Sequence, residues 1–87
     1  MKISGEKIEK ISEQILALLY SISPKSLFTS HIAKELARDE EFVRSLLDSL
    51  EKKKLISKIT KNPRGVDYLK RIRWKLSDAA YLAYKNH

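Results

Sequence analysis

The sequence contains no cysteine, only two glycines and two prolines, and no long apolar run. Without cysteine there are no disulfides, no thiolate nucleophile and no cysteine-ligated zinc. Two isolated glycines cannot form a glycine-rich phosphate loop. The longest apolar stretch, residues 15–20, is far shorter than the roughly 20 residues needed to span a bilayer. No apolar stretch with a small-residue cleavage site follows the start of the chain, so we expect no signal peptide and a cytoplasmic protein.

Histidine, a residue type common in active sites, occurs only at His31 and at the last position, His87. No cysteine and no second nearby histidine can join His31 in a metal-ligand set. We interpret His31 as an exposed helix residue rather than as a base or a ligand. The acidic side chains lie three or four residues from cations, which is typical of solvated helix faces. We therefore expect no enzyme activity, no catalytic residue, no metal and no cofactor.

Charge is abundant and unevenly distributed along the chain, whose net charge is +7. Residues 1–51 hold 7 Lys/Arg and 9 Asp/Glu, a balance of −2, whereas residues 52–87 hold 11 and 2, a balance of +9. Such asymmetry favours a polyanionic partner for the second part of the chain. The alternative is an ordinary lysine-rich surface that keeps the protein soluble.

Apolar spacing predicts two helices in the first part of the chain. The first runs from about residue 4 to residue 20, with apolar residues three and four positions apart on one stripe. These are Ile8, Ile11, Ile15, Leu18 and Ile22. Pro24 and its neighbouring serines end the helix. The second helix is expected over residues 30–37, with Thr29 as its N-cap because the hydroxyl can accept a free backbone amide.

A third helix is predicted after Asp39, which we interpret as its N-cap. Its apolar residues fall at i, i+3, i+4 and i+7, namely Val43, Leu46, Leu47 and Leu50. The opposite face is polar. Three acids in a row, Asp39, Glu40 and Glu41, begin the helix, and lysines end it. Both charges match the helix dipole, which favours anions at the N-terminus and cations at the C-terminus.

The pattern then changes to that of β-strands. "LISKIT", residues 55–60, and "VDYLKRIRWKL", residues 66–76, flank "KNPRG", in which Pro63 and Gly65 suit a type I turn. A β-hairpin follows, with Trp74 and Leu76 expected in the core beneath it. "LF", at residues 27–28, is at most a stub of strand. Ser77 is predicted to cap a last short helix over residues 78–85.

The predicted order is helix, short strand, helix, helix, strand, strand, helix, a mostly α fold with a small β-hairpin. "FTSHIAKELARDEEFVRSLLDSLEKKKLI" resembles the helix-turn-helix of small winged-helix transcription regulators, particularly the MarR-like and ArsR-like groups. "WKLSDAA" is similar to the end of their wing. The resemblance implies one domain over residues 1–87, with the helix-turn-helix at about 29–53, the wing at about 55–76 and the C-terminal helix at about 77–85. The hairpin is longer than the usual wing, and the third helix has an unusually acidic start.

The resemblance implies that the third helix enters the major groove of DNA and that the wing follows the backbone or reaches the minor groove. The candidate residues on the third helix are Arg44, Ser45, Ser49 and Glu41. The candidates on the wing are Lys58, Lys61, Arg64, Lys70, Arg71 and Arg73. Arg44 is the strongest candidate for reading a base, because a guanidinium can bond bidentately to guanine. The alternative for Arg44 is an i, i+4 ion pair with Glu40 or Asp48.

Three partners remain open from the sequence: double-stranded DNA, RNA through the same basic hairpin, and another protein. The last alternative is a winged-helix interaction module of a transcription or replication complex that has lost sequence-specific DNA binding. The acidic start of the third helix favours it. The basic hairpin favours DNA, and a prokaryotic DNA-binding protein of this kind would be associated with the nucleoid.

A homodimer through the first and last helices is also predicted. Tyr81, Leu82 and Tyr84 leave the last helix apolar on more than one side. A helix of this kind needs a second element or a second chain packed against it. Leu16 and Leu19 lie off the main stripe of the first helix. Dimers formed through the terminal helices are also what the family resemblance implies.

Overall fold

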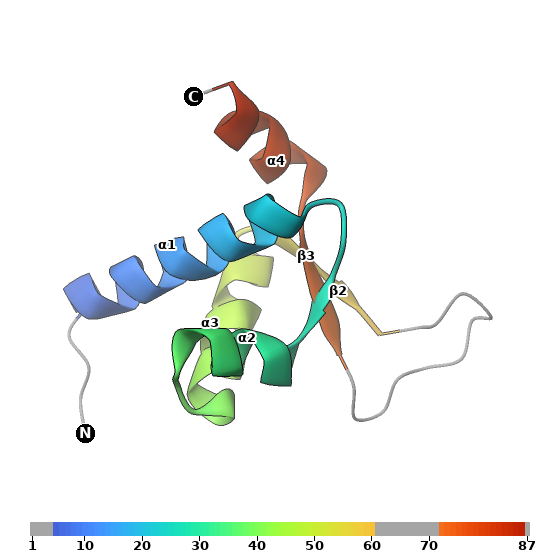
Figure 1. Cartoon of the computed structure of the whole chain (residues 1–87). Helices are drawn as coiled ribbons and strands as arrows, with labels where there is room; N and C mark the ends of the chain where they lie inside the picture. The colour runs from blue at the N-terminus through green and yellow to red at the C-terminus, as the bar shows by residue number, and fades with distance from the viewer. Residues whose placement is uncertain (1–4, 61–71, 87) are drawn as a thin grey trace.

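The computed structural model describes residues 5–60 and 72–86. In chain order these form α1 (Gly5–Ile22), β1 (Leu27–Phe28), α2 (Thr29–Leu36), α3 (Glu40–Lys52), β2 (Ile56–Ile59), β3 (Arg73–Leu76) and α4 (Asp78–Lys85) (Figure 1). The predicted order and the mostly α fold with a small hairpin are confirmed. Other predictions lie outside the described residues. These are the turn at Pro63 and Gly65 and the wing candidates Lys61, Arg64, Lys70 and Arg71.

The sheet is antiparallel with strand order β1-β3-β2. The stub at residues 27–28 is thus a strand, and it pairs with β3 so that Leu27 lies opposite Trp74. On the other side of β3, Lys58 of β2 lies opposite Trp74 as well. Alternate residues of a strand point to opposite faces, and accordingly Trp74 and Leu76 are buried whereas Arg73 and Lys75 are only half-buried. The prediction that Trp74 and Leu76 belong to the core is confirmed.

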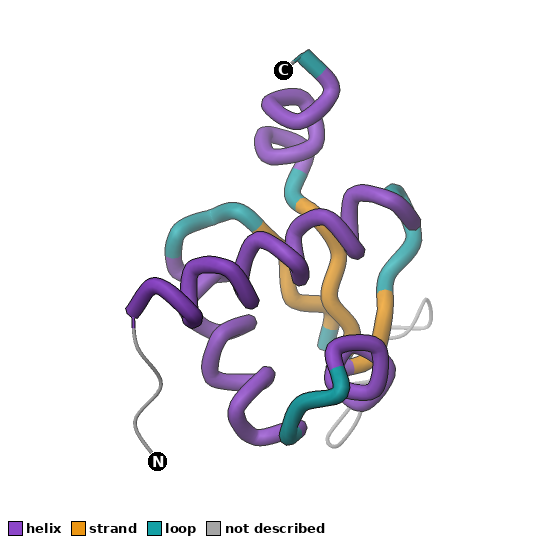
Figure 2. Tube along the Cα trace, turned by 60° about the vertical axis from the view of Figure 1, so that its left-hand side comes forward, coloured by secondary structure: helices purple, strands orange, loops and turns teal. Residues whose placement is uncertain are grey.

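The core lies between α1, the helix pair and the sheet. α1 crosses on one side of the molecule and packs against α2, α3 and β3 (Figure 2). α3 buries the predicted apolar face completely, with Val43, Leu46, Leu47 and Leu50 all in the core. Burial of these side chains, not helix propensity, holds a helix of this length in place.

The prediction that Leu19 lies off the core stripe of α1 is wrong. Leu19 is buried together with Ile11 and Ile15, whereas the stripe residues Ile8, Leu18 and Ile22 are half-buried against the core. Relative to Ile15, positions i+3 and i+4 lie on either side of the same stripe at 3.6 residues per turn. Helix periodicity therefore admits either residue, and the packing of α1 on the rest of the fold selects Leu19. Because Leu19 is internal, it is not available to a dimer interface.

Two of the predicted helix caps are confirmed and one is wrong. The Asp39 carboxylate accepts a hydrogen bond from the Phe42 amide at 3.1 Å, and the Ser77 hydroxyl accepts one from Ala80 at 3.1 Å. Thr29 is not an N-cap but the first residue of α2. Its Oγ1 instead accepts a 2.8 Å hydrogen bond from Nε1 of Trp74. A buried indole N–H requires an acceptor, and leaving it unpaired would cost more than leaving the helix start without a side-chain cap.

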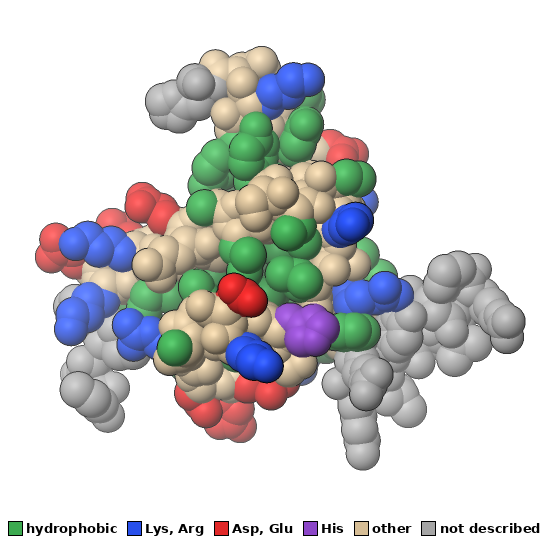
Figure 3. Space-filling view, in the orientation of Figure 1, with side chains coloured by type: hydrophobic (Ala, Val, Ile, Leu, Met, Phe, Trp, Pro, Cys, Tyr) green, Lys and Arg blue, Asp and Glu red, His purple; other side chains and the backbone are tan. Residues whose placement is uncertain are grey.

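α4 projects beyond the C-terminal end of α1 (Figure 1). It is anchored by Ala80, which is buried, and by stacking of its tyrosines on Tyr20 of α1. The ring centroids lie 5.5 Å apart for Tyr20 and Tyr81, and 5.3 Å apart for Tyr20 and Tyr84. Leu82 remains 55% exposed. Figure 3 shows apolar side chains gathered on α4 and on the adjoining end of α1.

Candidate nucleic-acid interface

α3 buries its apolar face in the core and presents its polar face to solvent. Glu41, Arg44 and Ser45 are exposed on this outer face, and Asp48 is half-buried. A shallow hollow with an acidic rim runs along this face, lined by Asp39, Glu40, Glu41, Arg44, Ser45 and Asp48. The Asp39 carboxylate is the cap of α3, where both its hydrogen bond and its charge stabilise the start of the helix.

Arg44 pairs with Asp48, one turn further along α3. Its Nε lies 4.0 Å from Oδ2 of Asp48, and the two side chains are 47% and 43% exposed. The alternative interpretation of Arg44 as one member of an i, i+4 pair is therefore confirmed, with Asp48 as the partner. Ion pairs this exposed are weak. The guanidinium is thus held loosely at the surface and is not committed to the fold.

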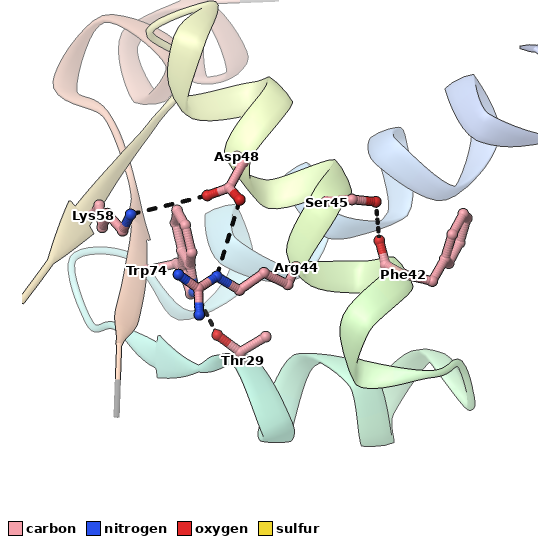
Figure 4. Close-up of polar contacts among 7 residues, drawn as sticks. All are labelled: Thr29, Phe42, Arg44, Ser45, Asp48, Lys58 and Trp74. Atoms are coloured by element: carbon pink, nitrogen blue, oxygen red, sulfur yellow. Dashed lines mark hydrogen bonds and ion pairs between the residues drawn. The ribbon is translucent and has the colours of Figure 1, made fainter. Parts of the chain in front are cut away.

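Lys58 approaches the same carboxylate from the sheet. Its Nζ lies 4.0 Å from Oδ1 of Asp48 and 5.6 Å from the centroid of the Trp74 ring. Trp74 bonds to Thr29 at the start of α2, and Lys58 pairs with Asp48 of α3, so the base of the wing is connected to both helices of the helix-turn-helix (Figure 4). Lys58 and Arg44, predicted independently as wing and helix candidates, are thereby brought to one side of the molecule.

The serines are placed differently from each other. Ser45 donates its hydroxyl to the carbonyl oxygen of Phe42 at 2.6 Å and, like Arg44, lines the hollow on the outer face of α3 (Figure 4). Its oxygen can still accept a hydrogen bond from a base or a protein donor. Ser49 lines a separate groove between α3 and α1, together with Ile8 and Glu13. The structure therefore does not bring Ser49 beside Arg44.

Arg73 of β3 lies opposite Phe28 of β1 in the sheet. Its guanidinium carbon is 5.6 Å from the ring centroid of Phe28, and the rings of Phe28 and His31 form a T-shaped contact with their centroids 5.6 Å apart. His31 is exposed, as predicted. Beside this cluster a hollow of about 370 Å³ separates the starts of α2 and α3; it is lined by Phe28, Thr29, Ser30, His31, Glu40, Arg44 and Ile72.

Sequence reasoning missed Phe28 and Ser30 as neighbours of Arg44. No local pattern places residues at the start of α2 beside Arg44; only the tertiary structure brings them to one hollow. Sequence reasoning also missed the contact between Lys58 and Asp48, for which no local pattern exists. In residues 5–60 and 72–86 there is no group of three or more His, Cys, Asp or Glu side chains able to hold a metal ion. Over the same ranges, no helix combines the length and the apolarity needed to cross a membrane.

A helix-turn-helix with an outward-facing second helix, followed by a hairpin that a short strand extends into a three-stranded sheet, defines a winged-helix protein. The resemblance to MarR-like winged-helix regulators is confirmed by solved structures of MarR-family regulators that share this fold. Neither a protein-family profile nor a curated protein sequence matches the chain.

Two similar regulators are MepR of Staphylococcus aureus and ZitR of Lactococcus lactis. The MepR-DNA complex superposes with a TM-score of 0.72 at 27% identity, covering 93% of this chain and 66% of that chain. Another MepR structure, described as a transcription regulator of the multidrug efflux pump MepA, has a TM-score of 0.69 at 28% identity and covers 93% and 59%. A ZitR mutant in apo form has a TM-score of 0.72 at 23% identity and covers 94% and 57%. The chain thus spans between about half and two thirds of the length of these relatives.

Proposed function

We propose that this chain is a single winged-helix domain that binds double-stranded DNA as a transcription regulator. The observation that carries the proposal is its likeness to MepR in complex with DNA, at 27% identity over 93% of this chain. The exposed face of α3 and the balance of +9 over residues 52–87 support it. Such a protein would act in the cytoplasm, where the chromosome of a prokaryote lies.

In this proposal α3 approaches the major groove and the wing contacts the backbone. Arg44 reads a base, with Ser45 and Glu41 beside it on the outer face of α3, whereas Ser49 faces the groove toward α1 and is left out of the contact. Lys58 and Arg73, at the base of the wing, and Lys61, Arg64, Lys70 and Arg71, further along it, meet phosphates. The acidic start of α3 has an explanation within the fold, since Asp39 is the cap and Glu40 and Glu41 lie in the first turn, where the helix dipole favours anions. Among the described residues no other observation favours that alternative.

Binding of random duplex DNA, measured by fluorescence anisotropy across a salt series, tests the proposal. We expect weak binding at low salt. The logarithm of the observed association constant should fall linearly with the logarithm of the salt concentration, with a slope of about −3 or steeper. Each phosphate neutralised contributes close to one unit of that slope. RNA of the same sequence serves as competitor and is expected to displace the DNA poorly. Absence of duplex binding at the lowest salt would contradict the proposal.

We also place a homodimer contact at the terminal helices, mainly on α4. Leu82 and Tyr84 are large apolar side chains that the chain itself leaves exposed, by 55% and 36%. Tyr84 stacks on Tyr20 of α1, and Figure 3 shows apolar side chains gathered on α4 and on the adjoining end of α1. A second copy of the chain would bury this surface, and burying apolar area is the main driving force for association.

Sedimentation equilibrium tests the dimer. The chain is expected to have about twice its mass of 10.1 kDa at micromolar concentration, and Leu82→Glu is expected to return it to 10.1 kDa. A carboxylate at this position would lose its hydration in the interface without gaining a partner. Lys34→Gln on α2 lowers the net charge by the same single unit and should leave the dimer intact. A monomer at all concentrations would contradict the prediction.

A further inference from the structure

The carboxylate of Asp48 lies between two cations that come from different elements. Oδ2 faces Nε of Arg44 on α3, and Oδ1 faces Nζ of Lys58 on β2, each at 4.0 Å (Figure 4). All three side chains are partly exposed, by 47% for Arg44, 43% for Asp48 and 28% for Lys58. A negative charge in this position pairs with the same two cations that a phosphate approaching α3 and β2 would attract.

The fold does not depend on these two ion pairs. α3 is held by its buried apolar face. Lys58 is placed by the pairing of β2 with β3 and by the ring of Trp74. Partly exposed pairs at this distance contribute little to stability, because water screens them and two long side chains lose freedom. The negative charge of Asp48 therefore has more influence on what Arg44 and Lys58 can bind than on whether the chain folds.

We propose that Asp48 is an internal counter-ion that withholds Arg44 and Lys58 from non-specific phosphates and thereby sharpens the selectivity of DNA binding. The inference rests on the proposed function. A phosphate that attracts either cation must compete with a carboxylate already in place, so each contact releases fewer salt ions and gains less free energy. Arg44 overcomes this competition where it also bonds to the edge of a guanine, a contact that depends on sequence. Asp48 is thus a positioning residue, acting through the two cations.

Asp48→Asn tests the inference because it removes the charge and keeps the shape. We expect it to bind random duplex DNA about three- to tenfold more tightly at low salt, since two weak ion pairs no longer compete. The salt slope should become steeper by about one unit for each cation that is set free. Asp48→Glu keeps the charge and should have the same affinity for random duplex DNA and the same salt slope as the original chain.

The matched control is Glu9→Gln, which removes one negative charge at an exposed position of α1, away from Arg44 and Lys58. If Glu9→Gln raises affinity and slope as much as Asp48→Asn does, general electrostatics explains the effect and the inference is overturned. In the background of Lys58→Gln, the gain from Asp48→Asn should shrink, because one of the two withheld cations is absent. An undiminished gain in that background would also overturn the inference.

Selection of binding sites from a random duplex pool measures selectivity directly. The original chain should yield a sharper sequence motif than Asp48→Asn, and equally sharp motifs would count against the role of Asp48. The outcomes separate this inference from the proposed function. If the original chain binds duplex DNA and Asp48→Asn binds no better, only the role of Asp48 fails. If neither binds at the lowest salt, both fail, and if only Asp48→Asn binds, the inference is supported.

Discussion

Replacing Trp74 with alanine is expected to lower the free energy of unfolding by about 3–5 kcal/mol, the largest stability effect of any single substitution considered for this chain. Trp74 is completely buried at the centre of the sheet, where β1 and β2 pair with β3 on either side. Its removal leaves a cavity that the paired strands cannot close, and it also deprives Thr29 of its indole partner. Because Trp74 is the single tryptophan of the chain, urea unfolding should be followed by circular dichroism.

Trp74→Phe separates packing from hydrogen bonding. It keeps most of the ring volume but removes the N–H that donates to Thr29, so we expect a loss of only about 1–2 kcal/mol. Leu82→Ala, at an exposed position of α4, should change the unfolding free energy of the monomer by less than about 0.5 kcal/mol. An alanine variant of Trp74 as stable as the original chain would contradict the packing described for β3.

Substituting both Glu40 and Glu41 with lysine is expected to raise the affinity for random duplex DNA roughly 10- to 60-fold at about 0.1 M salt. The estimate assumes that each new lysine reaches one phosphate, which adds close to one unit to the salt slope. The two positions are exposed in the first turn of α3, the part of a recognition helix that enters the major groove between the phosphate backbones. The double substitution should lower helix stability by about 1–2 kcal/mol, because the helix dipole favours anions there.

The matched control for this experiment is Glu9→Lys with Glu13→Lys. It changes the charge by the same amount at exposed positions of α1, away from the outer face of α3. If the control raises affinity as much as the α3 variant does, α3 does not enter the groove. Loss of binding in Arg64→Ala with Arg71→Ala, together with no response to changes in α3, would assign the contact to the wing alone.

Much of the fold was predictable because local physics determines it. The spacing from Val43 to Leu50 predicts the buried face of α3, and all its members are buried. Asp39 and Ser77 act as caps because short polar side chains reach the free amides of the first turn regardless of the rest of the fold. The exposed residues of α3 in the candidate site were predictable for the same reason. A helix with one buried face must present Arg44 and its neighbours outward.

The sequence by itself thus determined the order of the elements, the core face of α3 and the distribution of charge that favours a polyanionic partner. Only the tertiary structure decided the contacts between elements. Thr29 bonds to Trp74 and does not cap α2, since a buried indole must be satisfied across 45 residues of sequence. Leu19 is internal where Leu18 was equally compatible with the helix period. Asp48 holds Lys58 as well as Arg44 because the strand pairing brings β2 beside α3. Periodicity and capping act within one element, whereas pairing and packing act between elements. The contact between Arg44 and Asp48 is of the first kind, and the contact between Lys58 and Asp48 is of the second.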